Sequence, residues 1–230
     1  MKVQWLDDLV NIFYPEVCLG CAEPLVNQEQ LICVSCLAEL PKTNFHQQDN
    51  NPVSGIFTGR IPFKKATSYL FFQKKGIVQS LIHNLKYRNF PGVGKRLGRM
   101  AGAELKRSGF MNDIDCIIPI PLHNKKYRKR GYNQSEAIAR GLSETSLKPI
   151  VSGNLVRITH SATQTRKSRF ARWRNVEHIF GVREPATLEN QHILLVDDVV
   201  TTGSTLEAAA TKLLTIPGLK LSLFTLAYAP

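Results

Sequence analysis

The sequence lacks long apolar runs, a secretory leader and repeats. No run of about 18 apolar residues occurs, so a membrane-spanning helix is excluded. Asp7 and Asp8 stand where a secretory signal needs a basic region and then a continuous apolar stretch. There is also no internal repeat and no low-complexity tract. We therefore expect a soluble, cytoplasmic protein with no membrane span.

Acidic residues are scarce relative to basic ones. The 230 residues include 30 Lys and Arg but only 18 Asp and Glu, which gives a net charge of +12. Residues 122–183 hold fourteen basic and three acidic residues, so nearly the whole excess lies there. A field of one sign attracts polyanions such as nucleic acid, pyrophosphate or an acidic protein face. The alternative is a solvated surface that only maintains solubility.

Cysteine is infrequent, but its spacing is informative. Four of the five cysteines form two CxxC pairs, Cys18 with Cys21 and Cys33 with Cys36, separated by 11 residues. Two such turns complete a tetrahedral, closed thiolate site, which predicts structural Zn²⁺. Two disulfides, or a thioredoxin-like redox pair, are the alternatives; a reducing cytoplasm and the absence of a strand-to-helix context disfavour them. Cys116 lies in an apolar run and is expected in the core.

Hydrophobic periodicity predicts an α/β fold. Short apolar strands alternate with helices, which favours an open parallel sheet flanked by helices. Residues 1–44 are expected to form a helix and the zinc element, and residues 45–230 the α/β domain. Residues 41–60 and 159–176 are expected to be an irregular connection and a long loop. The expected helices cover residues 3–13, 77–87, 93–106, 133–142 and 204–214, and the strands cover residues 66–72, 115–119, 192–196 and 219–228.

The most informative segment is residues 193–205, with the sequence ILLVDDVVTTGST. Its apolar start predicts a strand buried on both faces, and Asp197 and Asp198 follow at the end where open α/β sheets bind ligands. The next turn opens a helix, so its N–H groups and hydroxyls can hold a phosphate. Gly203 allows close approach of the backbone. The segment therefore predicts a site for a phosphorylated ribose, against the alternatives of an ordinary capped turn or a phosphoacceptor domain.

This segment resembles, at all 13 positions, the phosphoribosyl-pyrophosphate (PRPP) signature of type I phosphoribosyltransferases. The resemblance implies that the two acids contact the ribose hydroxyls and that the turn holds the 5′-phosphate, with Mg²⁺ bound alongside PRPP. The implied PRPP-binding residues are Asp197, Asp198, Val199, Thr201, Thr202, Gly203, Ser204 and Thr205.

A basic segment follows the strand predicted at residues 115–119. Arginine binds phosphate bidentately and lysine binds it as a point charge, so this segment is a pyrophosphate candidate. Its aromatic residues could stack bases while cations follow a nucleic-acid backbone, or could pack against the sheet. The pyrophosphate and loop candidates are Pro119, Ile120, Pro121, Leu122, Lys125, Arg128, Arg130 and Arg172. The nucleic-acid candidates are Tyr127, Arg130, Tyr132, Arg169, Trp173 and Arg174.

With the cysteine knuckles in front of these segments, residues 12–228 resemble the ComF/GntX family of competence-associated, phosphoribosyltransferase-like bacterial proteins. The resemblance implies a role in natural transformation: handling incoming single-stranded DNA with a competence helicase-like partner and recombination-mediator proteins. The alternative is an active phosphoribosyltransferase of nucleotide metabolism, which transfers ribose 5-phosphate from PRPP to a base or amine. The sequence identifies no catalytic residue: His123 and His160 lie in suitable loops, but a histidine in a loop is usually a surface residue.

Overall fold

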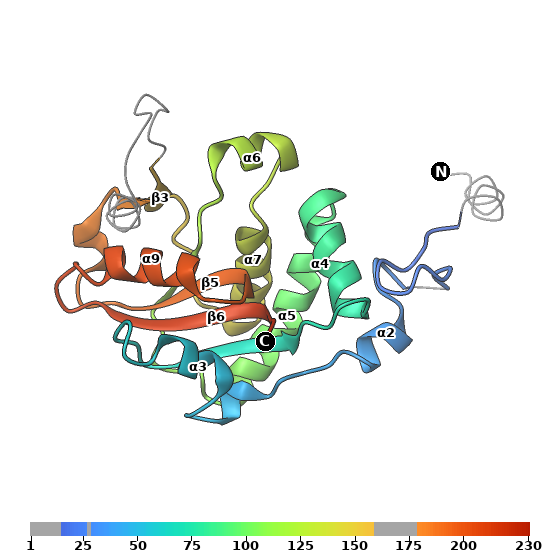
Figure 1. The fold of residues 1–230 in the computed structure, drawn as a ribbon, viewed down its shortest axis with the longest axis horizontal. Coiled ribbons are helices and arrows are strands. Elements are labelled where there is room, and N and C mark those ends of the chain that lie inside the picture. The colour runs from blue at the N-terminus through green and yellow to red at the C-terminus, as the bar shows by residue number, and fades with distance from the viewer. Residues whose placement is uncertain (1–14, 27–28, 159–178) are drawn as a thin grey trace, which may run out of the picture.

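The computed structural model describes residues 15–26, 29–158 and 179–230 (Figure 1). The helix expected over residues 3–13 lies outside this part. The helices are α2 (Val34–Ala38), α3 (Pro52–Phe57), α4 (Ile77–Tyr87), α5 (Pro91–Arg107), α6 (Asn124–Arg130), α7 (Gln134–Ser146) and α9 (Ser204–Leu213). The strands are β1 (Ala66–Phe71), β2 (Cys116–Pro119), β3 (Leu155–Arg157), β4 (Phe180–Val182), β5 (His192–Val200) and β6 (Lys220–Tyr228). Short 3₁₀ turns are η1 (Phe45–Gln47) and η2 (Pro185–Leu188).

Four strands form one parallel sheet in the order β1-β6-β5-β2. Parallel strands need crossover connections, and the helices between them supply these. Strand β5 is central, and its side chains alternate between two cores: Leu194 and Val196 join one, Ile193 and Leu195 the other. Such a strand is buried on both faces, as its unbroken apolar run predicts.

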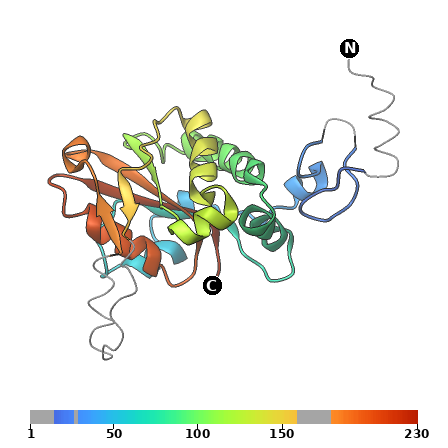
Figure 2. The ribbon, with the colours of Figure 1, turned by 90° about the horizontal axis from the view of Figure 1, so that it is seen from above.

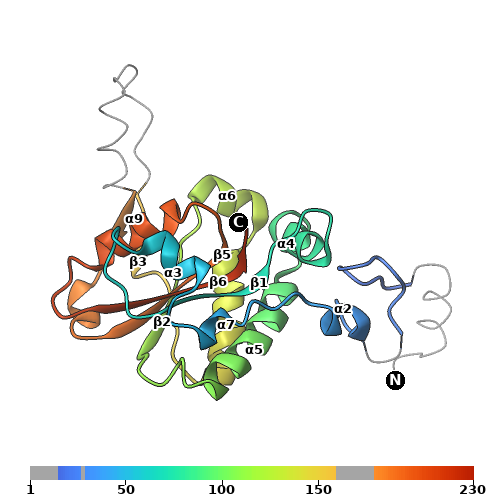
Figure 3. The same ribbon diagram turned by 60° about the horizontal axis from the view of Figure 1, so that its bottom comes forward.

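Helices cover both faces of this sheet (Figure 3). Helices α4, α5 and α7 contribute to the core that contains Leu194, whereas α3 and α9 contribute to the core that contains Leu195. The expected parallel α/β fold is therefore confirmed, and Cys116 is buried as expected. None of the helices in the described ranges is both long and apolar enough to cross a bilayer.

Four features differ from the sequence prediction. Residues 41–60 are not wholly irregular, because Asn51 and Ser54 form a capping box that starts α3 at Pro52. The basic segment after Pro121 is itself helical as α6. Strands β3 and β4 form a small antiparallel pair on either side of the expected long loop; residues 159–178 of that loop lie outside the described residues. Strand β5 also continues through both aspartates to Val200.

Glycines bring α5 and α7 into close contact. A Cβ added at Gly141 of α7 would lie 2.1 Å from the Lys95 carbonyl oxygen, and one added at Gly98 of α5 would lie 2.3 Å from the Ile138 carbonyl oxygen. Backbone atoms cannot move aside as a flexible side chain can. The small residues of α5 therefore set the distance at which these two helices pack.

We predict that Gly141→Ala lowers the free energy of unfolding by about 1–3 kcal/mol or more, because the helices must separate to admit a methyl group. Urea denaturation measures this change. The matched control is Gly55→Ala in α3, where an added Cβ meets nothing within 4 Å; there stability should stay constant or rise by up to about 1 kcal/mol. Equal stability of the two variants would contradict the packing argument.

Candidate functional site

The turn between β5 and α9 packs closely against α3. Gly203 has φ +75°, and an added Cβ would lie 2.7 Å from Ile56 Cγ2 and 2.8 Å from Phe57 Cε1. The residue must therefore be glycine both for its backbone angle and for the space that α3 leaves. Thr201, Thr202, Ser204 and Thr205 are exposed around a small cavity of about 60 Å³ at this helix N-terminus.

The support for this turn comes from the part of the chain expected to be irregular. Arg60 follows α3, and its Nη1 donates a hydrogen bond to the Thr202 carbonyl oxygen at 2.9 Å. The same guanidinium pairs with Glu207 in the first turns of α9. Helix α3 and Arg60 thus hold the turn in place. The local sequence of residues 201–205 does not reveal this support.

Two neighbouring carboxylates lie directly before the turn. Asp197 Oδ1 accepts hydrogen bonds from the Ser135 hydroxyl at 3.0 Å and from the Asp198 backbone N–H at 2.8 Å. Asp198 Oδ1 lies 3.0 Å from the Lys86 ammonium nitrogen. Burial, and then the charge of Asp198, raises the pKa of Asp197 to about 7. Cations or hydrogen-bond donors near the two carboxylates would therefore stabilise their charged forms, and a ligand with its metal could supply both.

A cleft of about 240 Å³ opens above this acid pair. Both aspartates, Thr205 and the start of α7 line it, and basic side chains face it from α4 and α6. Gln134 is 1% exposed; its Oε1 accepts from Arg130, and its Nε2 has no hydrogen-bond partner within the described ranges. A buried polar group without a partner is costly and indicates a missing ligand or water. The cleft is therefore the candidate ligand site.

Some of the predicted pyrophosphate candidates line this cleft and others do not. Ile120, Pro121, Leu122 and Arg130 line it, and Pro119 lies at the carboxyl end of β2 beside it. Lys125 and Arg128 are exposed on α6 and do not line it, and Arg172 lies outside the described residues. Lys126 and Gln134, which also line the cleft, lie in the basic segment predicted to bind pyrophosphate, whereas Lys86, Ser135 and Arg157 line it without having been predicted. These last three residues reach the cleft through contacts between distant segments and have no local sequence signal.

The aromatic candidates have two different surroundings. Tyr127 of α6 is 49% exposed, whereas Tyr132 donates its hydroxyl to the Leu85 carbonyl and packs against the core. Tyr87, at the end of α4, is 62% exposed, and the Arg130 guanidinium lies 5.2 Å from its ring centre. Arg169, Trp173, Arg174 and His160 lie outside the described residues. His123 caps α6 by accepting the Lys125 N–H, and it does not line the cleft.

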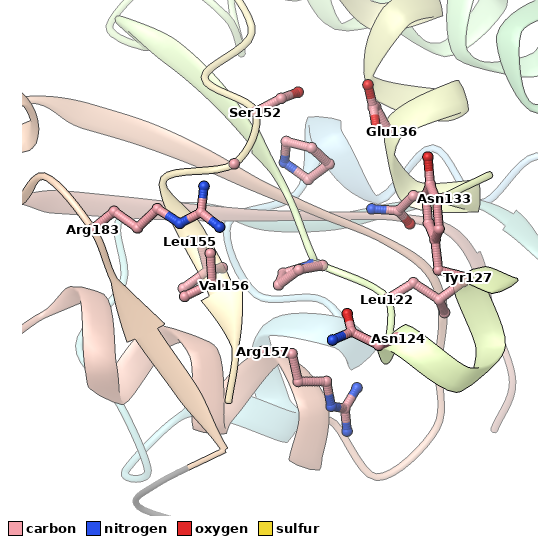
Figure 4. Close-up of a pocket in the computed structure, with 13 residues that line it drawn as sticks. Leu122, Asn124, Tyr127, Asn133, Glu136, Ser152, Leu155, Val156, Arg157 and Arg183 are labelled. Atoms are coloured by element: carbon pink, nitrogen blue, oxygen red, sulfur yellow. The ribbon is translucent and has the colours of Figure 1, made fainter. Parts of the chain in front are cut away.

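A second, larger cavity of about 540 Å³ adjoins the cleft (Figure 4). Arg157 and Arg183 project into it from the β3–β4 pair, and Glu136 and Tyr127 face them from α7 and α6. The cavity and the cleft share four lining residues, Pro121, Leu122, Asn133 and Arg157, so the two spaces adjoin there.

The four cysteines expected to bind metal come together in one cluster. The ligand atoms of Cys18, Cys21, Cys33 and Cys36 all lie within 4.8 Å of one another. The Cys21 and Cys33 sulfurs are 3.8 Å apart, close to the sulfur separation of a tetrahedral site with Zn–S bonds of about 2.3 Å. Burial would raise the pKa of the Cys18 thiol, but the N–H groups of Cys33, Cys21 and Gly20 lower it to about 6. The cluster can therefore hold a metal ion such as zinc.

This cysteine segment lies to one side of the sheet and against α4 (Figure 2). Asn84 of α4 donates a hydrogen bond from Nδ2 to the Leu19 carbonyl oxygen at 2.9 Å. Gly20 approaches so closely that an added Cβ would lie 3.0 Å from Cys36 Sγ and 3.1 Å from Ile77 Cγ2. The cluster thus packs on the same helix that carries Lys86.

We predict one zinc ion per chain by elemental analysis. Cys21→Ser combined with Cys33→Ser removes two of the four thiolate ligands and should lower the zinc content at least tenfold, since zinc needs all four. The matched control is Cys116→Ala, which removes a buried thiol outside the cluster and should retain one zinc. A stable, fully reduced and metal-free natural protein would contradict this prediction.

Comparison with known proteins agrees with this geometry. Residues 120–230 match the family described as the phosphoribosyl transferase domain. The chain is 32% identical over 137 residues to DNA utilization protein YhgH of Salmonella typhimurium, covering 58% of this chain and 60% of that protein. It is 32% identical over 133 residues to Competence protein F of Haemophilus influenzae, covering 55% and 57%. The solved structure of adenine phosphoribosyltransferase from Saccharomyces cerevisiae is 14% identical to this chain, with a TM-score of 0.38. The aligned part is 60% of this chain and 69% of that chain.

The matched region spans less than two thirds of each of the two curated relatives. The region that matches the phosphoribosyl transferase domain, residues 120–230, includes the acid pair, the turn at residues 201–205 and the segment after β2. A four-cysteine cluster precedes that region, at the position where the sequence placed it. Residues 120–230 therefore carry a phosphoribosyl transferase domain, and the chain is similar to proteins named DNA utilization protein YhgH and Competence protein F.

Proposed function

We propose that this protein binds PRPP with Mg²⁺ in the cleft above Asp197 and Asp198, and that it acts in natural transformation by handling incoming single-stranded DNA. The observation that carries the PRPP proposal is the juxtaposition of the acid pair, the turn at residues 201–205 and the Gln134 Nε2, which has no hydrogen-bond partner within the described residues. The names of the relatives, DNA utilization protein and Competence protein F, support the biological role.

The proposed ligand has three parts, and the site offers a partner to each. The N–H groups and hydroxyls of the turn at residues 201–205 bind the 5′-phosphate at the start of α9. Asp197 and Asp198 accept hydrogen bonds from the ribose hydroxyls. Lys126 and Arg130 face the pyrophosphate from α6. When bound, Mg²⁺ supplies positive charge to the pyrophosphate and to the acid pair.

We predict that Asp197→Asn with Asp198→Asn weakens PRPP binding at least 100-fold. The amides keep the shape of the carboxylates but lose the charge that strengthens each hydrogen bond to a ribose hydroxyl. Isothermal titration calorimetry in the presence of Mg²⁺ measures the affinity, and circular dichroism checks that the fold persists.

The matched control replaces two exposed acids outside the cleft, Asp49→Asn with Asp113→Asn. This variant loses the same charge and should bind PRPP as the natural protein does. Normal affinity in the cleft variant, or equal losses in both variants, would refute the assignment.

The alternative function is phosphoribosyl transfer to a base or amine in nucleotide metabolism. The same cleft favours it, since a gripped ribose and a neutralised pyrophosphate are the requirements for loosening the C1′–O bond. Among the described residues that line the cleft there is no histidine to act as a general base. Pyrophosphate release across a panel of bases distinguishes the two functions: binding without release favours DNA handling, and release with one acceptor favours the transferase.

The DNA proposal rests on the surface beside the cleft. Lys86, Tyr87, Asn89, Lys126, Lys129 and Arg130 line a groove of about 250 Å³ between α4 and α6. The exposed Tyr87 ring stacks with Arg130, and the cations of α6 continue away from the cleft. An aromatic platform within a basic groove is the arrangement that single-stranded nucleic acids bind without sequence preference.

We predict that the protein binds labelled oligo-dT and that its affinity falls steeply as KCl is raised, since each phosphate contact releases counterions. Lys126→Ala with Lys129→Ala should lower the slope of log K against log salt by about 1–1.5, or about 0.7 for each lost contact. Fluorescence anisotropy measures the slope. The control is Lys212→Ala with Lys220→Ala, at the opposite edge of the sheet, which should leave the slope unchanged. A salt-independent affinity would contradict a DNA-binding role for this face.

A further inference from the structure

Lys86 is the only lysine or arginine in the described ranges that pairs with either aspartate of the acid pair. Its Nζ lies 3.0 Å from Asp198 Oδ1, and the two side chains are only 22% and 15% exposed. Most surface ion pairs contribute little, because water screens both charges. The Lys86–Asp198 pair is largely shielded from water, so its attraction is less screened. Lys86 therefore neutralises the Asp198 carboxylate, which would otherwise lie beside Asp197 without a counter-ion.

The backbone that carries Lys86 is held firmly. Leu81 and Leu85 of α4 are fully buried, and the Leu85 carbonyl accepts the Tyr132 hydroxyl. Asn84 ties the helix to the cysteine segment on the other side. Lys86 therefore reaches Asp198 from a fixed point, and only its side chain is free to change partner.

From its position, Lys86 can pair either with Asp198 or with the pyrophosphate of the proposed ligand. Its side chain lines the cleft together with Lys126 and Arg130, the groups that face the pyrophosphate in the proposed complex. Asp198 accepts ribose hydroxyls in that complex, and the Lys86 ammonium competes with them for Oδ1. A lysine ammonium carries three donors on a flexible stem, and it can exchange one anionic partner for another within one cavity.

We propose that Lys86 is a specificity-determining residue: it neutralises Asp198 in the empty cleft and moves to the pyrophosphate when PRPP binds. This inference rests on the proposed function. It means that the cleft binds PRPP more tightly than pentose phosphates without pyrophosphate, because only PRPP provides a second anion with which Lys86 can pair. When ribose 5-phosphate binds, its hydroxyls weaken the Lys86–Asp198 ion pair and no new ion pair of Lys86 replaces it.

The test compares two ligands, PRPP and ribose 5-phosphate, by calorimetry with Mg²⁺. Lys86→Gln should weaken PRPP binding about 10- to 100-fold, the range expected for a lost hydrogen bond to a charged group. It should leave ribose 5-phosphate binding unchanged or stronger, because Asp198 is then free. Lys86→Arg keeps the charge and should restore part of the preference for PRPP. The matched control is Lys95→Gln on α5, which removes the 2.6 Å ion pair between Lys95 and Glu144 of α7. This variant should bind both ligands as the natural protein does.

The outcomes separate this inference from the proposed function. If the natural protein binds neither ligand, the PRPP assignment itself fails. If the natural protein binds PRPP and Lys86→Gln weakens both ligands equally, Lys86 only stabilises the acid pair and the inference is wrong. The inference also fails if Lys86→Gln leaves the affinity for PRPP unchanged.

Discussion

Two carboxylates follow each other at the end of the central strand, half-buried and beside a turn that is itself suited to anions. Burial, and then the charge of Asp198, raises the pKa of Asp197. The neighbouring elements compensate: α7 supplies the Ser135 hydroxyl, and α4 supplies the Lys86 ammonium. Helices α7 and α4 therefore both contact the acid pair at this edge of the sheet. Further hydrogen-bond donors would stabilise the two carboxylates, which makes the cleft the candidate binding site.

Helix α4 connects this site to the cysteine cluster. Asn84 contacts the first knuckle, and Lys86, two residues later, contacts Asp198. Segments as short as residues 15–40 usually need a metal or disulfides to fold alone, so a metal held by the four thiolates would add to the stability of this one. The knuckle in turn packs against the helix that brings a cation to the acid pair. The cysteines thus support the ligand cleft by packing and take no part in its chemistry.

Much of this arrangement could be predicted where the signal is local. The apolar run of β5, the two aspartates and the glycine-containing turn are contiguous, and the spacing of the cysteines anticipated their cluster. Helix α3 was missed because Pro52 and Gly55 resemble a loop; the Asn51 and Ser54 capping box was the available signal. The Lys86–Asp198 and Arg60–Glu207 pairs join segments distant in sequence. Only the order of the strands brings those residues together, so no local pattern could reveal them.

In the proposed complex, one crevice holds a sugar phosphate between the acid pair and the turn at residues 201–205. A crystal structure of the protein grown with PRPP and Mg²⁺ would show this directly. We expect the 5′-phosphate on the backbone N–H groups of that turn and the ribose hydroxyls on Asp197 and Asp198. An empty crevice, or PRPP bound elsewhere on the basic surface, would contradict it.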